Sequence, residues 1–253
     1  MIVANPPLRI GARDPDVRLL AFHHAGGSAA AFLPLLPLLS QNTETVLFQL
    51  PGRGPREEHL RARDFGEAMD GFLGQASEIT PRPSTELVDR PVVVLGHSLG
   101  ALFAHTYVTR LDAAARRHVV GLVLSAPPKV LGRGTPVHLR PAAPLLTRDP
   151  TRLEQELRRY GGCPESVLAD PPRLAEAVRL YGYDLHLTDT YPGAPPVEDV
   201  PVQVWRGASD PAFAGRAEVP GRHRTYPGGH FFLFEDDGPA ADLVRLLRLS
   251  VHR

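Results

Sequence analysis

The segment Gly96–Gly100 (GHSLG) has the pattern G-x-S-x-G, which can present a serine nucleophile. The pattern alone is common, but here it follows an apolar run, Pro91–Leu95, and precedes a helix-like segment, Leu99–Leu111. A strand, a sharp turn and a helix are the setting in which this motif exposes a serine hydroxyl at a strand end. The helix amino terminus also favours negative charge that develops there. We interpret Ser98 as a nucleophile; the alternative is a serine that only caps the helix.

A serine hydroxyl is a poor nucleophile unless a base takes its proton. His230, in a Gly-Gly loop after the last expected strand, is the candidate base. Asp210 follows the preceding strand and is the candidate acid that orients the imidazole. The order Ser98, Asp210, His230 is the order found in α/β-hydrolases. Three other aspartates compete for the role of the acid, and the last two are placed to cap the final helix: Asp184, Asp236 and Asp237.

An acyl-transfer site also needs two backbone N–H groups for the developing oxyanion. Leu99, directly after the nucleophile, supplies one of them. The other is expected from Ala25 in the Gly-rich loop His23–Ser28, after the first predicted strand. His23 and His24 are not expected to bind a metal, because adjacent side chains point apart and no third ligand is suitably spaced.

The overall composition excludes several classes of protein. The chain has 253 residues with 28 basic and 28 acidic side chains, so its formal net charge of zero argues against nucleic-acid binding. The most apolar stretch, Ala25–Leu39, is too short to span a bilayer. Residues Met1–Asp16 lack the pattern of a signal peptide. Cys163 is the only cysteine, which excludes an internal disulfide and suits a cytoplasmic location.

Apolar runs separated by helix-like segments predict an α/β fold, with a mostly parallel sheet between helices and a single domain over residues 1–253. From about residue 140 to 200 only helical patterns are found, with Gly161, Gly162 and Gly182 as candidate hinges. We interpret this segment as an inserted helical lid; the alternative is an ordinary long crossover. The expected strands are Val17–Phe22, Thr45–Leu50, Pro91–Leu95, Val119–Leu124, Val202–Trp205 and His223–Tyr226.

Taken together, the motifs resemble those of the type II thioesterases that accompany polyketide synthases and nonribosomal peptide synthetases. The resemblance covers nearly the whole chain and is carried by His24–Ser28, Leu50–Gly54, Gly96–Gly100, Tyr160–Gly162, Trp205–Pro211 and Gly228–His230. It implies an α/β-hydrolase fold with a helical lid. It also implies an editing enzyme that hydrolyses acyl or aminoacyl thioesters by a Ser-His-Asp acyl-enzyme mechanism. The enzyme would need no cofactor of its own, because the substrate is carried on the phosphopantetheine of an acyl or peptidyl carrier protein.

The expected partners are therefore carrier proteins, which are typically acidic in these systems, and neither a membrane nor a nucleic acid; we expect a monomer. Arg53 and Arg56 follow the second strand, whose carboxyl end should face the same side as Ser98. An arginine fork binds phosphate in bidentate fashion and keeps its charge. We predict that both arginines lie near the mouth of the site and contact the carrier protein or its phosphate.

The sequence departs from the family pattern at three places. His23 replaces a usual proline, Gly182-Tyr183-Asp184 replaces Arg-Ala-Asp, and Ser125–Pro128 lacks the familiar Ser-Gly-Arg. None of these belongs to the expected triad, but the changes leave room for a specialised role such as product release. Two alternatives stay open: another serine hydrolase reaction (carboxylesterase, acyltransferase or cyclase), and an inactive hydrolase fold that only binds.

Overall fold

The computed structural model describes residues 7–39, 41–77, 88–133, 148–212, 219–235 and 237–251. Its centre is one seven-stranded sheet with the strand order β1-β3-β2-β4-β5-β6-β7. Neighbouring strands are parallel except for β1, which pairs antiparallel with β3 at the edge. The strands are β1 (Leu8–Gly11), β2 (Val17–Phe22), β3 (Thr43–Phe48), β4 (Val92–His97), β5 (Val119–Ser125), β6 (Val202–Gly207) and β7 (Arg222–Tyr226).

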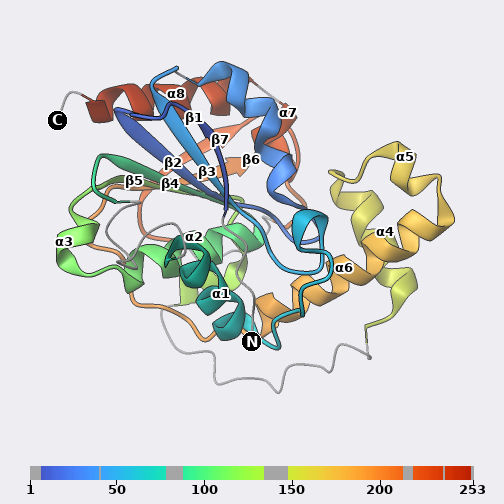
Figure 1. The fold of residues 1–253 in the computed structure, drawn as a ribbon. Coiled ribbons are helices and arrows are strands. Elements are labelled where there is room, and N and C mark those ends of the chain that lie inside the picture. Colours follow the sequence, from blue (N-terminus) through green and yellow to red (C-terminus); the bar gives the residue numbers. More distant parts are fainter. Residues whose placement is uncertain are drawn as a thin grey trace.

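Helices cover both faces of this sheet (Figure 1). The α-helices are α1 (Phe65–Ser77), α2 (Leu99–Arg110), α3 (Ala113–Arg116), α4 (Pro150–Tyr160), α5 (Glu165–Leu168), α6 (Pro171–Asp189), α7 (Phe232–Glu235) and α8 (Asp237–Val251). The described residues also form three 3₁₀ helices: η1 (Ala29–Leu38), η2 (Gly54–Arg56) and η3 (Lys129–Arg133). In the part of the chain described, no helix combines the length and the hydropathy needed to cross a membrane.

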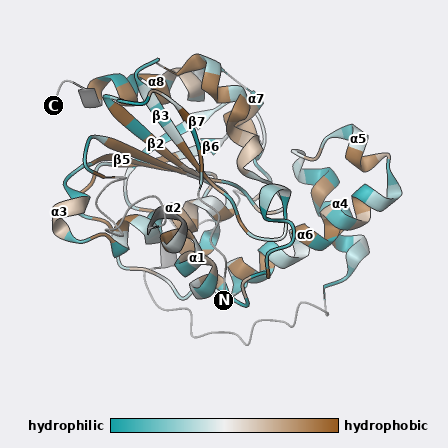
Figure 2. Ribbon diagram, in the orientation of Figure 1, coloured by the Kyte–Doolittle hydropathy of each residue, from teal (hydrophilic) through white to brown (hydrophobic). Residues whose placement is uncertain are grey.

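The alternation of side chains along the buried strands creates two hydrophobic cores. In β2, Leu20 and Phe22 face α1 and α2, whereas Leu19 and Ala21 face η1 and α8. Because both faces are covered, the central strands are mostly apolar (Figure 2), although β2 carries Arg18. The prediction of an α/β-hydrolase sheet flanked by helices is confirmed.

Two local elements depart from the regular pattern of strands and α-helices. Residues Ala29–Leu38 form a 3₁₀ helix, because their two internal prolines cannot donate the hydrogen bonds of an α-helix. Strand β1 was not predicted, because its four residues are mostly exposed and form no apolar run. Asp64 caps α1, with its carboxylate accepting the Glu67 N–H at 2.9 Å.

Between β5 and β6 the described residues 148–200 contain the helices α4, α5 and α6 and no strand. These helices lie together at one end of the sheet in Figure 1. Gly182 is not a hinge in this arrangement, since it lies inside α6, where a Cβ would meet Leu153 of α4 at 2.7 Å. The glycine instead lets the two helices pack closely. Residues 140–147 of the predicted lid lie outside the described residues.

Candidate active site

Ser98 lies at the turn between β4 and α2 with φ 55° and ψ −120°, a conformation that is rare for serine. Two glycines make the turn possible because other backbone atoms approach them closely. A Cβ on Gly96 would meet the Gly100 carbonyl oxygen at 2.1 Å, and one on Gly100 would meet the Phe22 carbonyl oxygen at 2.0 Å. The Ser98 N–H donates to the Ser125 carbonyl at 2.8 Å. The turn therefore places Ser98 at the carboxyl end of β4.

His230 and Asp210 lie on neighbouring loops that follow β7 and β6. His230 Nδ1 is 3.0 Å from Asp210 Oδ2, and the Asp210 side chain is almost fully buried. Ser209 joins the loops, because its N–H and its hydroxyl both donate to the Gly228 carbonyl, at 3.0 and 2.8 Å. A Cβ on Gly207 would lie 2.0 Å from a carbonyl of the histidine loop, so glycine permits this approach. The two loops are held as one unit that carries the acid and the histidine.

Ser98 and His230 line a single cavity of about 370 Å³. Ala25 and Leu99, the two residues expected to supply oxyanion-hole N–H groups, line the same cavity. The ring of Tyr160, the last residue of α4, lies 5.2 Å from the His230 ring. Further lining residues come from α4 and α6: Leu157, Tyr181, Leu185 and Thr188. Four of the five residues expected in the triad and the oxyanion hole therefore line one cavity, and the fifth, Asp210, is buried and contacts His230.

A second histidine–serine pair lies beneath this site. His97 Nδ1 is 2.9 Å from Ser125 Oγ, and both residues are fully buried. Burial, reinforced by the neighbouring His230 and His24, holds the pKa of His97 well below its ordinary value. A substrate carbonyl has no access to the Ser125 hydroxyl, so this pair joins β4 to β5 rather than reacting.

The loop after β2 holds two buried histidines. Burial and the charge of Arg53 lower the pKa of His23 to about 3, and burial together with other histidines lowers that of His24 to about 3. His23 Nε2 accepts the Leu50 N–H at 3.3 Å, and its Nδ1–H donates to the His24 carbonyl at 2.8 Å. His23, the departure from the family's proline, therefore joins this loop to the loop after β3. Within the described residues no group of His, Cys, Asp and Glu is arranged to hold a metal ion.

Arg53 and Arg56 lie in the interior, with only 5% and 3% of their surface exposed, which argues against the predicted contact of these side chains with a carrier protein or its phosphate. Two nitrogens of Arg53 each lie 2.6 Å from an oxygen of Asp184. Arg56 donates to the Gln49 carbonyl at 2.6 Å, and its Nε is 3.1 Å from His59 Nδ1. Both guanidiniums turn inward because carboxylate and carbonyl acceptors there match their donors.

Asp184, the competing candidate for the catalytic acid, pairs with Arg53 and not with His230. Its Oδ2 also accepts the Gly26 N–H at 2.7 Å. These partners are 131 and 158 residues away in the chain, so no local spacing could have revealed them. Asp237 begins α8, and Asp236 lies outside the described residues.

The thioesterase domain family matches residues 17–248, which is most of the chain. The chain belongs to the thioesterase family. It is 31% identical over 234 residues to a probable cadicidin biosynthesis thioesterase of Streptomyces griseus, a match that covers 88% of this chain but 60% of that protein. This chain therefore spans about three fifths of the length of that relative.

Two solved structures are similar to this thioesterase over nearly all of both chains. RedJ, a thioesterase from the prodiginine biosynthetic pathway of Streptomyces coelicolor, has a TM-score of 0.74 and 25% identity, covering 94% of this chain and 91% of its own. BorB, a type II thioesterase from the borrelidin biosynthetic cluster, has a TM-score of 0.72 and 25% identity, covering 94% and 96%. The resemblance to type II thioesterases that the motifs predicted is confirmed.

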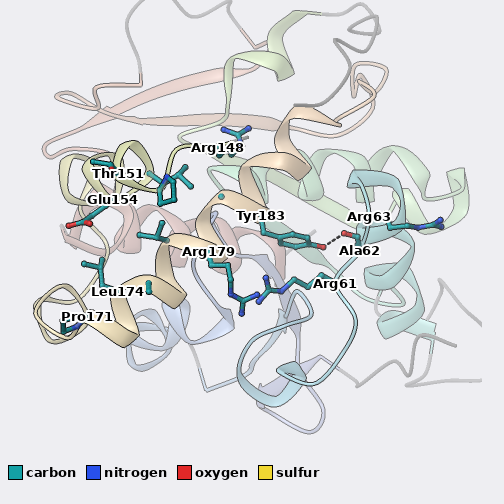
Figure 3. Close-up of a pocket in the computed structure, with 15 residues that line it drawn as sticks. Arg61, Ala62, Arg63, Arg148, Thr151, Glu154, Pro171, Leu174, Arg179 and Tyr183 are labelled. Carbon is teal, nitrogen blue, oxygen red and sulfur yellow. Dashed lines mark hydrogen bonds between the residues drawn. The ribbon is translucent and has the colours of Figure 1, made fainter. Parts of the chain in front are cut away.

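Helix α6 separates the candidate catalytic cavity, which Ser98 and His230 line, from a larger cavity of about 980 Å³. Tyr181 and Leu185 line the smaller cavity, whereas Val178, Gly182 and Tyr183 line the larger one (Figure 3). Ser98 and His230 line the smaller cavity, which makes that one the candidate reaction chamber.

Proposed function

We propose that the chain hydrolyses acyl or aminoacyl thioesters from the phosphopantetheine arm of carrier proteins in polyketide or nonribosomal peptide biosynthesis, in an editing role. The observation that carries this proposal is the Asp210–His230 hydrogen bond beside Ser98 on its strained turn. Membership of the thioesterase family and the likeness to BorB and RedJ support it. We propose that the reaction takes place in the cytoplasm.

In the acylation step, Ser98 Oγ attacks the thioester carbonyl while His230 Nε2 takes the hydroxyl proton. Asp210 accepts from Nδ1–H and stabilises the imidazolium that forms. The N–H groups of Ala25 and Leu99 receive the oxyanion. The tetrahedral intermediate collapses, the C–S bond breaks, and His230 returns the proton to the leaving pantetheine thiolate.

In the deacylation step, water replaces the thiol in the cavity. His230 takes a proton from the water, the hydroxide attacks the ester carbonyl, and the proton passes to Ser98 Oγ as the acid leaves. If an alcohol or amine within the acyl chain attacked instead, the same residues would release a cyclic product, and if an alcohol or amine of a separate acceptor attacked, the acyl group would be transferred to that acceptor. The choice of attacking group therefore separates hydrolysis from the acyltransferase and cyclase alternatives.

We further propose that α4–α6 form the lid through which the pantetheine arm enters. Leu157 and Tyr160 of α4 and Tyr181 of α6 line the catalytic cavity, so displacement of these helices would change access to Ser98. Gly161 and Gly162 follow α4 with φ of 79° and 80°, and can absorb backbone rotation there.

The test is intact-protein mass spectrometry of acyl-carrier proteins incubated with the enzyme. We expect loss of the acyl mass and appearance of the free acid, with Ser98→Ala lowering kcat on the order of 10⁶-fold. Ser166→Ala, which removes an exposed serine of α5, is the matched control and should leave turnover unchanged. Undiminished hydrolysis by Ser98→Ala would overturn the mechanism, and a cyclised or transferred product would favour the alternative reaction.

A further inference from the structure

The loop that carries Ala25 is held from outside by two charged side chains. Asp184 Oδ2 accepts the Gly26 N–H at 2.7 Å, and Arg53 Nη1 donates to the Gly27 carbonyl at 2.8 Å. The same two side chains form a bidentate ion pair with both N–O distances at 2.6 Å. Asp184 belongs to α6, whereas Arg53 precedes η2, so three distant segments meet at this loop.

The held segment is a tight turn. The Gly27 N–H donates to the His24 carbonyl at 3.1 Å, which makes Ala25 and Gly26 the two central residues. Gly26 has φ 74°, as the third residue of a type II turn requires. The peptide between Ala25 and Gly26 can rotate in such a turn, because types I and II differ chiefly in its orientation. Asp184 binds the N–H of this peptide and so fixes one orientation.

The ion pair is costly if its only role is to stabilise the fold. Both side chains are withdrawn from water, with 4% and 0% of their surface exposed. Buried pairs of this kind are often no better for stability than apolar residues of the same volume. What apolar residues could not do is accept the Gly26 N–H and donate to the Gly27 carbonyl. The hydrogen bonds to Gly26 and Gly27 therefore explain why this buried position carries two charged side chains.

Helix α6 also contacts the substrate cavity and a second part of the chain. Tyr181, Leu185 and Thr188 line the catalytic cavity. On the other side of α6, the Tyr183 hydroxyl donates to the Ala62 carbonyl, and the Arg61 guanidinium lies 5.3 Å from the Tyr183 ring (Figure 3). The position of α6 thus determines both the wall of the cavity and the position of Asp184.

We propose that Asp184 is a positioning residue that makes the oxyanion hole depend on α6. It places the N–H of Ala25 by fixing the adjacent peptide, and Arg53 holds both Asp184 and the end of the turn. When α6 packs against the turn, the oxyanion hole is complete. When α6 moves away with the lid, the Gly26 N–H loses the carboxylate that accepts its hydrogen bond. This proposal rests on the proposed thioesterase function, because it assigns Ala25 to the oxyanion hole of that reaction.

The first test is Asp184→Asn, compared with Asp189→Asn on the same helix. Asp189 forms its ion pair with Arg148, so this variant controls for the loss of an α6 ion pair. We expect Asp184→Asn to lower kcat about 10- to 100-fold with little change in KM for an acyl-carrier protein, since one oxyanion donor is worth about 10²- to 10³-fold. Asp189→Asn should leave both constants near the wild-type values.

The second measurement separates positioning from stability. An alkyl boronic acid forms a tetrahedral adduct on Ser98 and places an oxygen in the oxyanion hole. The carbonyl oxygen of the bound substrate interacts less strongly with the same N–H groups. We expect Asp184→Asn to weaken boronic-acid inhibition about as much as it lowers kcat. Unchanged inhibition would overturn the proposal.

Because Asp184→Asn leaves Arg53 without its carboxylate, the double variant Arg53→Met/Asp184→Leu removes both charges together. If the ion pair had only a structural role, this folded variant would keep the wild-type kcat, and that result would overturn the proposal. Continued loss of kcat with a wild-type melting temperature is the expected result. Failure of the proposed function is distinguishable, because the wild-type enzyme itself would then lack Ser98-dependent hydrolysis.

Discussion

The Nδ1 atom of His230 lies 3.0 Å from Asp210 Oδ2, with the Asp210 side chain 1% exposed. A carboxylate can only accept, so Nδ1 carries the hydrogen and Nε2 is left free to act as a base. The other carboxylate oxygen accepts the Ala212 N–H at 2.9 Å. Both oxygens of Asp210 are therefore engaged as acceptors, which fixes the histidine tautomer.

Asp210→Asn should lower kcat by roughly 10⁴-fold at neutral pH. An amide has one accepting oxygen, so it can satisfy either Ala212 or His230 but not both. If its NH₂ group faces His230, the imidazole takes the wrong tautomer. Steady-state kinetics on an acyl-carrier protein measure the effect, with Asp237→Asn at the start of α8 as the control. Near-wild-type activity would show that Asp210 is not the acid.

Gly100→Ala should abolish stable folding, because its Cβ would lie 2.0 Å from the Phe22 carbonyl oxygen, which belongs to the backbone of β2. Gly71→Ala in α1 makes the same change where a Cβ meets nothing within 4 Å. We expect Gly71→Ala to stabilise the protein by about 0.5–1 kcal/mol, since alanine favours the helix. Urea denaturation of both variants checks this contrast, and a stable Gly100→Ala protein would contradict it.

Much of the fold could be predicted from the sequence because it depends on local patterns. β2 is apolar at every position except Arg18, and its bounds were predicted residue by residue. Strand β1 escaped prediction because it is short, exposed and supported only by its pairing with β3.

The site residues also differ in whether a local pattern or a distant partner determines their place. Ser98 and His230 could be found because each stands in a local motif at a strand end. Arg53 was placed wrongly because its charge was interpreted without its partner Asp184, which lies 131 residues away. The sequence shows which residues are charged, but the pairing that decides burial depends on tertiary structure.

Buried histidines should make the protein less stable in mild acid. Burial lowers the pKa of His105 in α2 to about 4. Between the ordinary value near 6.5 and pH 4, the unfolded chain therefore binds a proton that the folded chain does not. The free energy of unfolding should fall with decreasing pH in this window, by up to about 1.4 kcal/mol per pH unit for this residue.

The measurement is urea denaturation of the wild type and His105→Gln at pH 7, 6 and 5. His105→Gln cannot take up this proton, so its free energy of unfolding should depend less on pH than that of the wild type. An equal dependence on pH in the two proteins would show that His105 is not buried in its neutral form.

Arg53→Glu should destabilise the protein by about 3–5 kcal/mol, because it places a second carboxylate beside buried Asp184. Arg63→Glu is the matched control: the Arg63 side chain is 88% exposed, and its change should cost less than about 1 kcal/mol. Chemical denaturation measures both. A fully stable Arg53→Glu enzyme with a raised, salt-dependent KM for carrier protein would instead support the docking role first predicted for this residue.

Leu157→Trp should shorten the acyl chains that the enzyme accepts. Leu157 of α4 lines the catalytic cavity and also an adjoining cavity of about 320 Å³, and both cavities include Ala25 and Phe231 in their walls. Leu157 is one of the residues that line both cavities, so an acyl group on Ser98 that extends from the first cavity into the second would contact this side chain. An indole there would fill the shared region, while an acetyl group next to Ser98 would not reach it.

We therefore expect Leu157→Trp to lower kcat/KM for long acyl chains about tenfold or more, the effect of one or two lost methylene contacts, with acetyl substrates nearly unaffected. Thr151→Trp introduces the same side chain on α4 but lines the larger cavity on the other side of α6, so it should leave chain-length preference unchanged. The measurement is kcat/KM across a series of acyl-pantetheine thioesters, with melting temperatures to confirm folding. Equal shifts for the two tryptophan variants, or no shift for either, would show that the acyl group does not pass Leu157. The longer acyl groups would then extend along another wall of the cavity.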